Sequence, residues 1–322
     1  MAHNGAVVDI TFNLFTDMNA FRTGSPTLTI ATMLAASLAL GALQEARGAV
    51  SYLTPGSTYS QNFDSLPNTP QNASLGNTSA GAGWTDDNAS PAANQLSILG
   101  WYLYHPTAAA EGGANGHQRL RIGAGTSTTG AFMSWGASGS TDRALGDLGA
   151  NTLASDTPTS PDLGNLYIAL RLHNDTGQTL DSFTLGFTGE QWHTGTGAAE
   201  TMTFGWSTTA ISVSDPSSAF NAVPALAWTA PVHTGAEGAV DGNANHVVLS
   251  PATVTGLNWA PDTDLWLRWT DPQALGPRDD GMGIDDLSFL ADVAVVPEPA
   301  TGTMLMFGLL ALGFFRVRSN RV

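Results

Sequence analysis

The chain has 322 residues, a formal net charge of −16 and no cysteine. The lack of cysteine excludes a disulfide framework and a thiolate metal site, and the negative charge disfavours binding to nucleic acid or to anionic lipid. All 11 basic residues are arginine. Apolar segments near both ends flank a long middle region rich in glycine and small polar residues, which is large enough to bury a substantial core.

The first apolar segment, residues 27–43, predicts an export signal. Arg22 precedes it, and the small residues Gly48 and Ala49 follow it. A basic residue, an apolar stretch and a small-residue exit, in this order, are typical of a secretory signal peptide. We expect cleavage after Gly48 or Ala49, and Met18 is a candidate for the true translation start. The alternative is an uncleaved N-terminal membrane anchor.

The middle region predicts β-strands joined by turns. Apolar and polar residues alternate in short stretches that Gly, Asn, Asp and Pro separate. The apolar positions that we expect to point inward fall within residues 166–172, 183–187, 202–206, 265–269 and 284–290. A period of two with one apolar face predicts antiparallel sheets. Because no amphipathic helix pattern accompanies them, we expect an all-β fold, an antiparallel β-sandwich of the jelly-roll type.

The expected organisation has three parts. Residues 1–49 form an N-terminal extension with the signal helix, residues 50–293 form the β-sandwich domain, and residues 294–322 form a tail with a short transmembrane helix. The alternative is a split of the middle region near residues 158–161, at Pro-Thr-Ser-Pro. A single domain is favoured because the first half has few strong strand patterns with which to close a core of its own.

Most catalytic signatures are missing from the sequence. There is no Gly-x-Ser-x-Gly elbow, no Walker loop and no His-Glu-x-x-His motif. Glu190 and Glu200 flank one predicted loop, and two carboxyl groups about 5–10 Å apart across a sugar site would suit a glycosidase. The simpler interpretation is that loop carboxylates accept hydrogen bonds from backbone donors. We therefore predict no catalytic residue, with polysaccharide hydrolysis as the alternative.

An acidic run near the end of the middle region predicts a metal site. Residues 279–286 contain four aspartates together with glycines that permit tight turns. Ca²⁺ takes about six to eight oxygen ligands, many of them from aspartate and backbone carbonyls. In a regular strand, Asp285 would lie on the same face as Leu287 and Phe289 and point towards the core. A carboxylate in that position needs a partner.

Asp64 belongs to the first predicted strand of the sandwich, and first and last strands often lie side by side in jelly rolls. We therefore predict a structural Ca²⁺ held by Asp64 with Asp285 and Asp286. The alternatives are that these aspartates are solvated, or that Asp285 bonds to Arg268 or to the backbone.

The nine tryptophans of the chain offer candidate sugar-binding residues. Trp269 falls on the inward face of its predicted strand, whereas Trp266 and Arg268 fall on the other face. An exposed tryptophan near carboxylates suits stacking against a sugar ring. We predict that Trp266, Arg268, Glu190 and Trp192 bind glycan. The alternative is that the tryptophans pack beneath long loops.

The tail has three parts in a fixed order. An apolar run covers residues 304–315, and three arginines follow it. Before the run stands the motif of Val296, Pro297, Glu298 and Pro299. The tail resembles the PEP-CTERM sorting signal, which combines such a motif, a short transmembrane helix and a basic end. The run is shorter than the roughly 20 residues of a stable spanning helix, so we expect a transient membrane anchor before cleavage.

This resemblance implies a secreted protein of a Gram-negative bacterium. Signal peptidase would process its front, and an exosortase would cut it near the motif and release it to the outer surface or the exopolysaccharide matrix. Residues 189–192, 265–271 and 283–289 also resemble an uncharacterised β-sandwich region of PEP-CTERM proteins and some extracellular nucleases. No nuclease motif accompanies them. We expect a non-catalytic module that binds glycan, or a purely structural matrix protein.

Overall fold

The computed structural model describes residues 48–69, 74–75, 84–86, 98–105, 120–128, 130–149, 165–272 and 279–294. Strands dominate these residues, and the helical elements among them are two short 3-10 turns, η2 (Ser217–Ala219) and η3 (Pro224–Leu226). None of the described helices is long and apolar enough to cross a membrane. The predicted signal helix and the predicted C-terminal helix lie outside the described residues.

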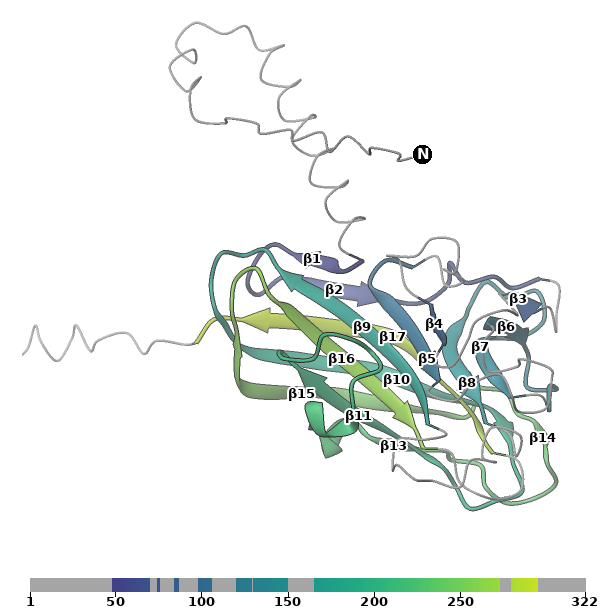
Figure 1. Ribbon diagram of the computed structural model, residues 1–322. Helices are drawn as coiled ribbons and strands as arrows, with labels where there is room; N and C mark the ends of the chain where they lie inside the picture. Colours follow the sequence, from purple (N-terminus) through teal and green to yellow (C-terminus); the bar gives the residue numbers. More distant parts are fainter. Residues whose placement is uncertain are drawn as a thin grey trace, which may run out of the picture.

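Two curled sheets pack face to face (Figure 1). Sheet A has the strand order β12-β11-β16-β9-β5-β4, and β1 pairs with β9 while β13 pairs with β11. Its strands are β1 (Val50–Tyr52), β4 (Trp84–Asp86), β5 (Trp101–His105), β9 (Leu166–Asn174), β11 (Thr201–Ser207), β12 (Asn221–Ala222), β13 (Trp228–Thr229) and β16 (Asp264–Asp271).

Sheet B has the order β14-β10-β17-β8-β7-β6-β3, and β15 pairs with β10 while β2 pairs with β17. Its strands are β2 (Thr58–Gln61), β3 (Ser74–Leu75), β6 (Leu120–Gly123), β7 (Ala131–Trp135), β8 (Ala144–Leu148), β10 (Leu180–Thr194), β14 (Gly238–Ala239), β15 (His246–Trp259) and β17 (Gly281–Asp292). Most strand pairs are antiparallel, so the predicted all-β sandwich is confirmed.

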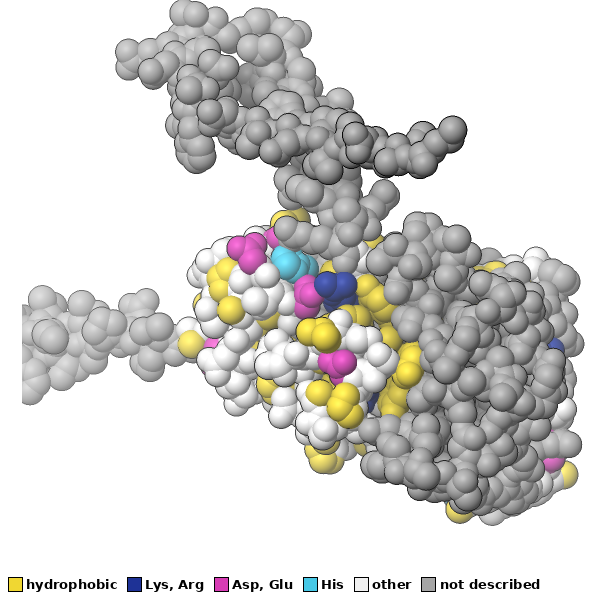
Figure 2. All heavy atoms as spheres, in the orientation of Figure 1, with side chains coloured by type: hydrophobic (Ala, Val, Ile, Leu, Met, Phe, Trp, Pro, Cys, Tyr) yellow, Lys and Arg dark blue, Asp and Glu magenta, His cyan; other side chains and the backbone are white. Residues whose placement is uncertain are grey.

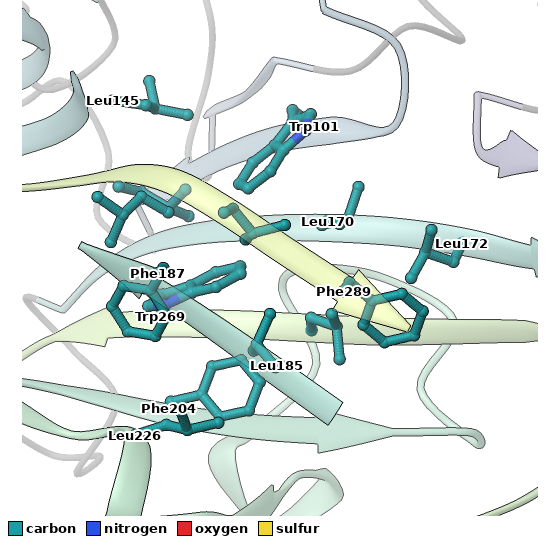
Figure 3. Packing of buried hydrophobic residues seen from close by; sticks show 14 of the residues in the cluster. Trp101, Leu145, Leu170, Leu172, Leu185, Phe187, Phe204, Leu226, Trp269 and Phe289 are labelled. Atoms are coloured by element: carbon teal, nitrogen blue, oxygen red, sulfur yellow. The ribbon is translucent and has the colours of Figure 1, made fainter. Parts of the chain in front are cut away.

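The main core lies between the sheets and is built from alternate residues of the long strands. At its centre the Trp269 ring stacks on Trp101, with the ring centroids 5.6 Å apart. Phe187 and Phe204 approach the same ring, at 5.7 and 5.1 Å between centroids (Figure 3). Burying an aromatic or aliphatic side chain of this size contributes about 1.5–3 kcal/mol, so this aromatic cluster is a large part of what holds the sheets together.

An irregularity in β17 decides where its aspartates point. Asp285 pairs with Thr188 of β10, and Ser288 pairs with Gly186, so β17 contains one residue more than β10 between these two pairs. Within this stretch Asp286 adopts a φ of 46°. The extra residue allows both Ile284 and Leu287 to reach the core, while Asp285 faces the other side of the sheet. The prediction that Asp285 shares a face with Leu287 is therefore wrong, because a bulge interrupts the two-residue period.

Candidate functional site

The outer face of sheet A carries a groove beside a long loop. The loop comprises residues 208–220, which follow β11. Figure 2 shows this face of the molecule, with hydrophobic side chains gathered around the loop. The groove has a volume of about 550 Å³. Its lining includes hydroxyl, amide and aromatic side chains and one guanidinium, which belong to Asn165, Thr203, Ser217, Phe220, Arg268 and Thr270.

Arg268 holds the loop against the sheet. Its side chain is 2 % exposed, and its Nη1 donates to the carbonyl oxygens of Val213 and Asp215 at 3.1 and 2.6 Å. Nη2 donates to Ser217 Oγ at 3.1 Å. The guanidinium carbon lies 3.7 Å from the centroid of the Phe220 ring. One side chain of β16 thus fixes both the loop and one wall of the groove.

The groove offers the chemistry that a sugar ring requires. Thr203 and Ser217 provide exposed hydroxyls, which both donate and accept hydrogen bonds. Phe220 is half-buried and provides part of an apolar wall. Concave sites that combine an apolar surface with a few convergent polar groups are typical of small-ligand binding.

Trp266 lies on the outer side of sheet A, as predicted, but it is not exposed. Only 2 % of its surface is accessible, because it packs beneath the loop with Ala210 and Val213. Its ring meets Tyr102 edge-on at 4.8 Å between centroids. Trp266 therefore supports the loop from below and is not available for stacking against a ligand.

Glu190 and Trp192 lie on the other sheet, on the outer face of β10. Trp192 Nε1 donates to Glu190 Oε2 at 2.9 Å, and both side chains are buried. Trp192 packs with Met133 and Trp135 in a small outer cluster. The structure therefore does not bring together the four predicted glycan-binding residues, and of these Arg268 alone lines the groove over sheet A.

The predicted calcium ligands are partly neighbours. β2, which ends at Gln61, pairs with the last described strand, β17, but Asp64 lies beyond β2, and the first strand, β1, pairs with β9. Asp285 is 4 % exposed, and burial raises its pKa to about 8, with further upward contributions from Glu190, Asp286 and Asp142. Asp64 is exposed, and its Oδ2 accepts a hydrogen bond from Asn62 Nδ2 at 2.7 Å. Asp285 and Asp286 thus lie near the carboxyl group of Glu190.

Glu190 and Glu200, the carboxyl pair considered for a hydrolase, belong to two separate groups. The acidic neighbours that act on Glu190 are Asp142 and Asp286, whereas those that act on Glu200 are Asp271 and Asp279. The described residues therefore do not assemble this pair across one site.

A second acidic group lies between the sheets, at the end of the sandwich where β16 ends and β17 begins. We call it the interior acidic cluster; its members are Asp147, Glu200, Asp271, Asp279 and Asp280, all of them buried. The backbone N–H groups of Gly195 and Glu200 donate to the two carboxylate oxygens of Asp280, at 2.8 and 3.3 Å. The N–H of Asp280 donates to Glu200 Oε2 at 2.8 Å. These bonds tie the β10–β11 connection to the start of β17.

Burial raises the pKa of Asp147 and of Asp271, and the neighbouring carboxyl group of Asp279 adds to both shifts. Burial also raises the pKa of Glu200, with additional contributions from Asp271 and Asp279. The carboxyl group of Asp279 therefore makes ionisation of Asp147, Glu200 and Asp271 less favourable.

Asp147 and Asp271 were not among the predicted site residues, although the alternation of apolar and polar residues contains a signal for both. Asp271 continues the inward face that Leu267 and Trp269 establish, and Asp147 shares the face of Leu145. Extending the two-residue period by one polar position would have placed both carboxyl groups in the core. A buried aspartate in such a position requires a partner.

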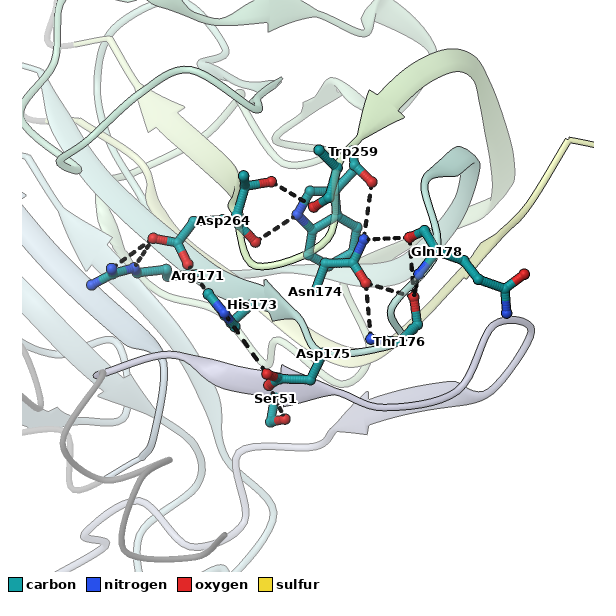
Figure 4. Close-up of polar contacts among 11 residues, drawn as sticks. Ser51, Arg171, His173, Asn174, Asp175, Thr176, Gln178, Trp259 and Asp264 are labelled. Atoms are coloured by element: carbon teal, nitrogen blue, oxygen red, sulfur yellow. Dashed lines mark hydrogen bonds and ion pairs between the residues drawn. The ribbon is translucent and has the colours of Figure 1, made fainter. Parts of the chain in front are cut away.

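A third polar group links β1 and β9 near the start of the sandwich (Figure 4). Asp264 Oδ2 accepts hydrogen bonds from Arg171 Nε at 2.9 Å and Nη2 at 2.6 Å, and its Oδ1 pairs with His173 Nδ1 at 2.7 Å. Ser51 Oγ donates to Asp175. Ligand atoms of His173, Asp175 and Asp262 lie within 4.8 Å of one another. The network fastens β1 to the end of β9 within sheet A.

Residues 295–319 match the family model of the PEP-CTERM protein-sorting motif. The search of the curated proteins found no match for the chain.

Two solved structures show distant similarity. One is TmCBM61 in complex with beta-1,4-galactotriose, with 8% identity, a TM-score of 0.25 and coverage of 48% of this chain and 74% of that chain. The other is the K1 cleaved adhesin domain of Lys-gingipain from Porphyromonas gingivalis W83, with 14% identity, a TM-score of 0.28 and coverage of 73% and 98%.

Proposed function

We propose that this chain, which carries a PEP-CTERM sorting motif at residues 295–319, presents a non-catalytic jelly-roll-type module that binds glycan at the bacterial surface. The motif implies processing by an exosortase and export to the surface. Exopolysaccharide would be the polymer nearest to the exported module. The groove over sheet A is the proposed binding site.

The arrangement of Arg268 carries this proposal. A buried guanidinium holds the loop at three oxygen atoms and lies against Phe220. The groove is therefore pre-organised, and a ligand would not have to order the loop on binding. Pre-organisation of this kind reduces the entropy cost of binding. Thr203 and Ser217 are exposed residues of the groove lining, and their hydroxyls would supply hydrogen-bond partners to a ligand.

The proposal is tested by blocking the groove. Thr203 is exposed on β11, so Thr203→Tyr would fill the groove while keeping a residue that strands favour. Thr255→Tyr is the matched control, because Thr255 is an exposed threonine of β15 on sheet B. The full chain and both variants would be applied to a glycan array.

We expect the wild type and Thr255→Tyr to bind the same glycans, and Thr203→Tyr to bind them at least about tenfold more weakly, a loss of about 1.4 kcal/mol. Equal binding by all three proteins would exclude the groove as the site. Binding of no glycan by the wild type would favour the alternative, a purely structural matrix protein.

A further inference from the structure

The interior acidic cluster joins both sheets at one end of the sandwich. Asp147 lies on β8 of sheet B, where it pairs with Phe132 on one side and Met282 on the other. Asp271 ends β16 of sheet A, on the face of Trp269. Residues on one face of a strand recur every second position, so both aspartates point into the space between the sheets.

Asp147 and Asp271 are completely buried, with an exposed fraction of 0% each. Among the described residues, no hydrogen-bond donor reaches any of their four carboxylate oxygens. The two carboxyl groups are close enough for each to act on the pKa of the other. The described charged groups that act on these two aspartates are all carboxyl groups. Burying such a group without a compensating partner is costly, and a buried charge requires a counter-charge or a metal.

We propose that the interior acidic cluster binds a calcium ion, with Asp147 and Asp271 as ligands from the two sheets and Glu200 and Asp279 beside them. Both oxygens of Asp280 already accept backbone N–H groups. Asp280 is therefore a positioning residue, which holds residues 195–200 and the start of β17 around the ion.

The donor set selects a hard cation. The described side chains of the cluster offer carboxylate oxygens, the ligands that Ca²⁺ prefers, and neither the sulfur nor the imidazole nitrogen that favours zinc or copper. Ca²⁺ tolerates irregular geometry with six to eight ligands, whereas Mg²⁺ requires a near-ideal octahedron. An ion at this position would bridge β8, β16 and the start of β17, and would stabilise the end of the sandwich.

The ligand atoms of His173, Asp175 and Asp262 all lie within 4.8 Å of one another. This group is nevertheless a weaker candidate for a calcium site than the interior acidic cluster. Asp262 is exposed, and His173 Nδ1 is already paired with Asp264 at 2.7 Å. Its members thus have alternative partners in water and protein. Oxygens on opposite sides of a Ca²⁺ ion lie about 4.6–5.2 Å apart, twice the usual ligand distance, so a Ca²⁺ site can be wider than that group.

Thermal unfolding of the full chain in EDTA and in excess CaCl₂ tests the proposal. At a Ca²⁺ concentration of about 100 times Kd, we expect the Tm to rise by about 5–10 °C, and MgCl₂ at the same concentration to have a smaller effect. Asp271→Asn and Asp147→Asn should each lose most of this rise. Because each replaces a buried carboxyl group, which burial makes costly to ionise, with a neutral amide, their Tm in EDTA should equal or exceed that of the wild type.

Asp285→Asn is the control, since Asp285 belongs to the predicted calcium site and not to the interior acidic cluster. It should keep the full calcium response. Two results would overturn the proposal: a wild-type Tm that Ca²⁺ does not change, or a response that survives in both Asp271→Asn and Asp147→Asn. Loss of the response in Asp285→Asn alone would move the ion to the site predicted from the sequence. Glycan binding by the groove is measured separately, so the two proposals can fail independently.

Discussion

Replacement of Arg268 by alanine should release the loop that borders the groove. The variant loses the two bonds of Nη1 to the carbonyls of Val213 and Asp215 and the bond of Nη2 to Ser217 Oγ. It also loses the contacts of the guanidinium with the rings of Phe220, at 3.7 Å, and Tyr167, at 4.3 Å.

The size of the effect follows from these contacts. Hydrogen bonds from a charged donor contribute about 1.5–3 kcal/mol each, and cation–π contacts contribute about 0.5–2 kcal/mol each. The carbonyls of a released loop regain water, which offsets part of the loss. We therefore expect Arg268→Ala to lower the free energy of unfolding by about 3 kcal/mol. Arg268→Lys should lose less, since it keeps the charge but not the forked geometry.

Urea unfolding, followed by tryptophan fluorescence, gives the change in stability. Hydrogen exchange measures whether the loss is local, and we expect the amides of residues 208–220 to exchange faster in Arg268→Ala while those of β9 stay protected. A stability within about 0.5 kcal/mol of the wild type, with unchanged exchange in the loop, would refute the role given to Arg268.

Two further predictions concern the core and the tail. Trp269→Ala should lower the free energy of unfolding by about 3–5 kcal/mol, because Trp269 is fully buried against three aromatic rings; Trp206→Ala, at a half-buried position, should cost clearly less in the same urea titration. Replacement of Pro297 and Glu298 by alanine should stop exosortase processing, because both lie in the matched sorting motif. Mass spectrometry would then find the full-length tail in the membrane fraction, and an unchanged cleaved product would contradict the assignment.

The buried face of a strand could be predicted from the sequence where the strand is regular, because apolar and polar residues then alternate along it. Leu166, Ile168, Leu170 and Leu172 of β9 all lie in the core, as expected. The same is true of Phe183, Leu185 and Phe187 of β10. Among these residues of both strands, one face lies against the core throughout, so the two-residue period alone predicts which side chains point inward.

The candidate site could not be predicted in the same way, because it depends on features that the alternation of apolar and polar residues does not reveal. The burial of Trp266 results from the loop above it, and sequence patterns do not reveal which loop covers which strand. The bulge at Asp286 reverses the direction of Asp285. The interior acidic cluster requires the strand order, because β8 pairs with β17, and its members lie far apart in the sequence.

Binding to native exopolysaccharide tests the central claim most directly. The full chain would be sedimented with exopolysaccharide from the bacterium that produces it, beside Thr203→Tyr and Thr255→Tyr. The account predicts that the wild type and Thr255→Tyr sediment with the polymer, while Thr203→Tyr stays in solution, because Thr203 lines the groove over sheet A. Sedimentation of Thr203→Tyr to the same extent as the wild type would contradict it.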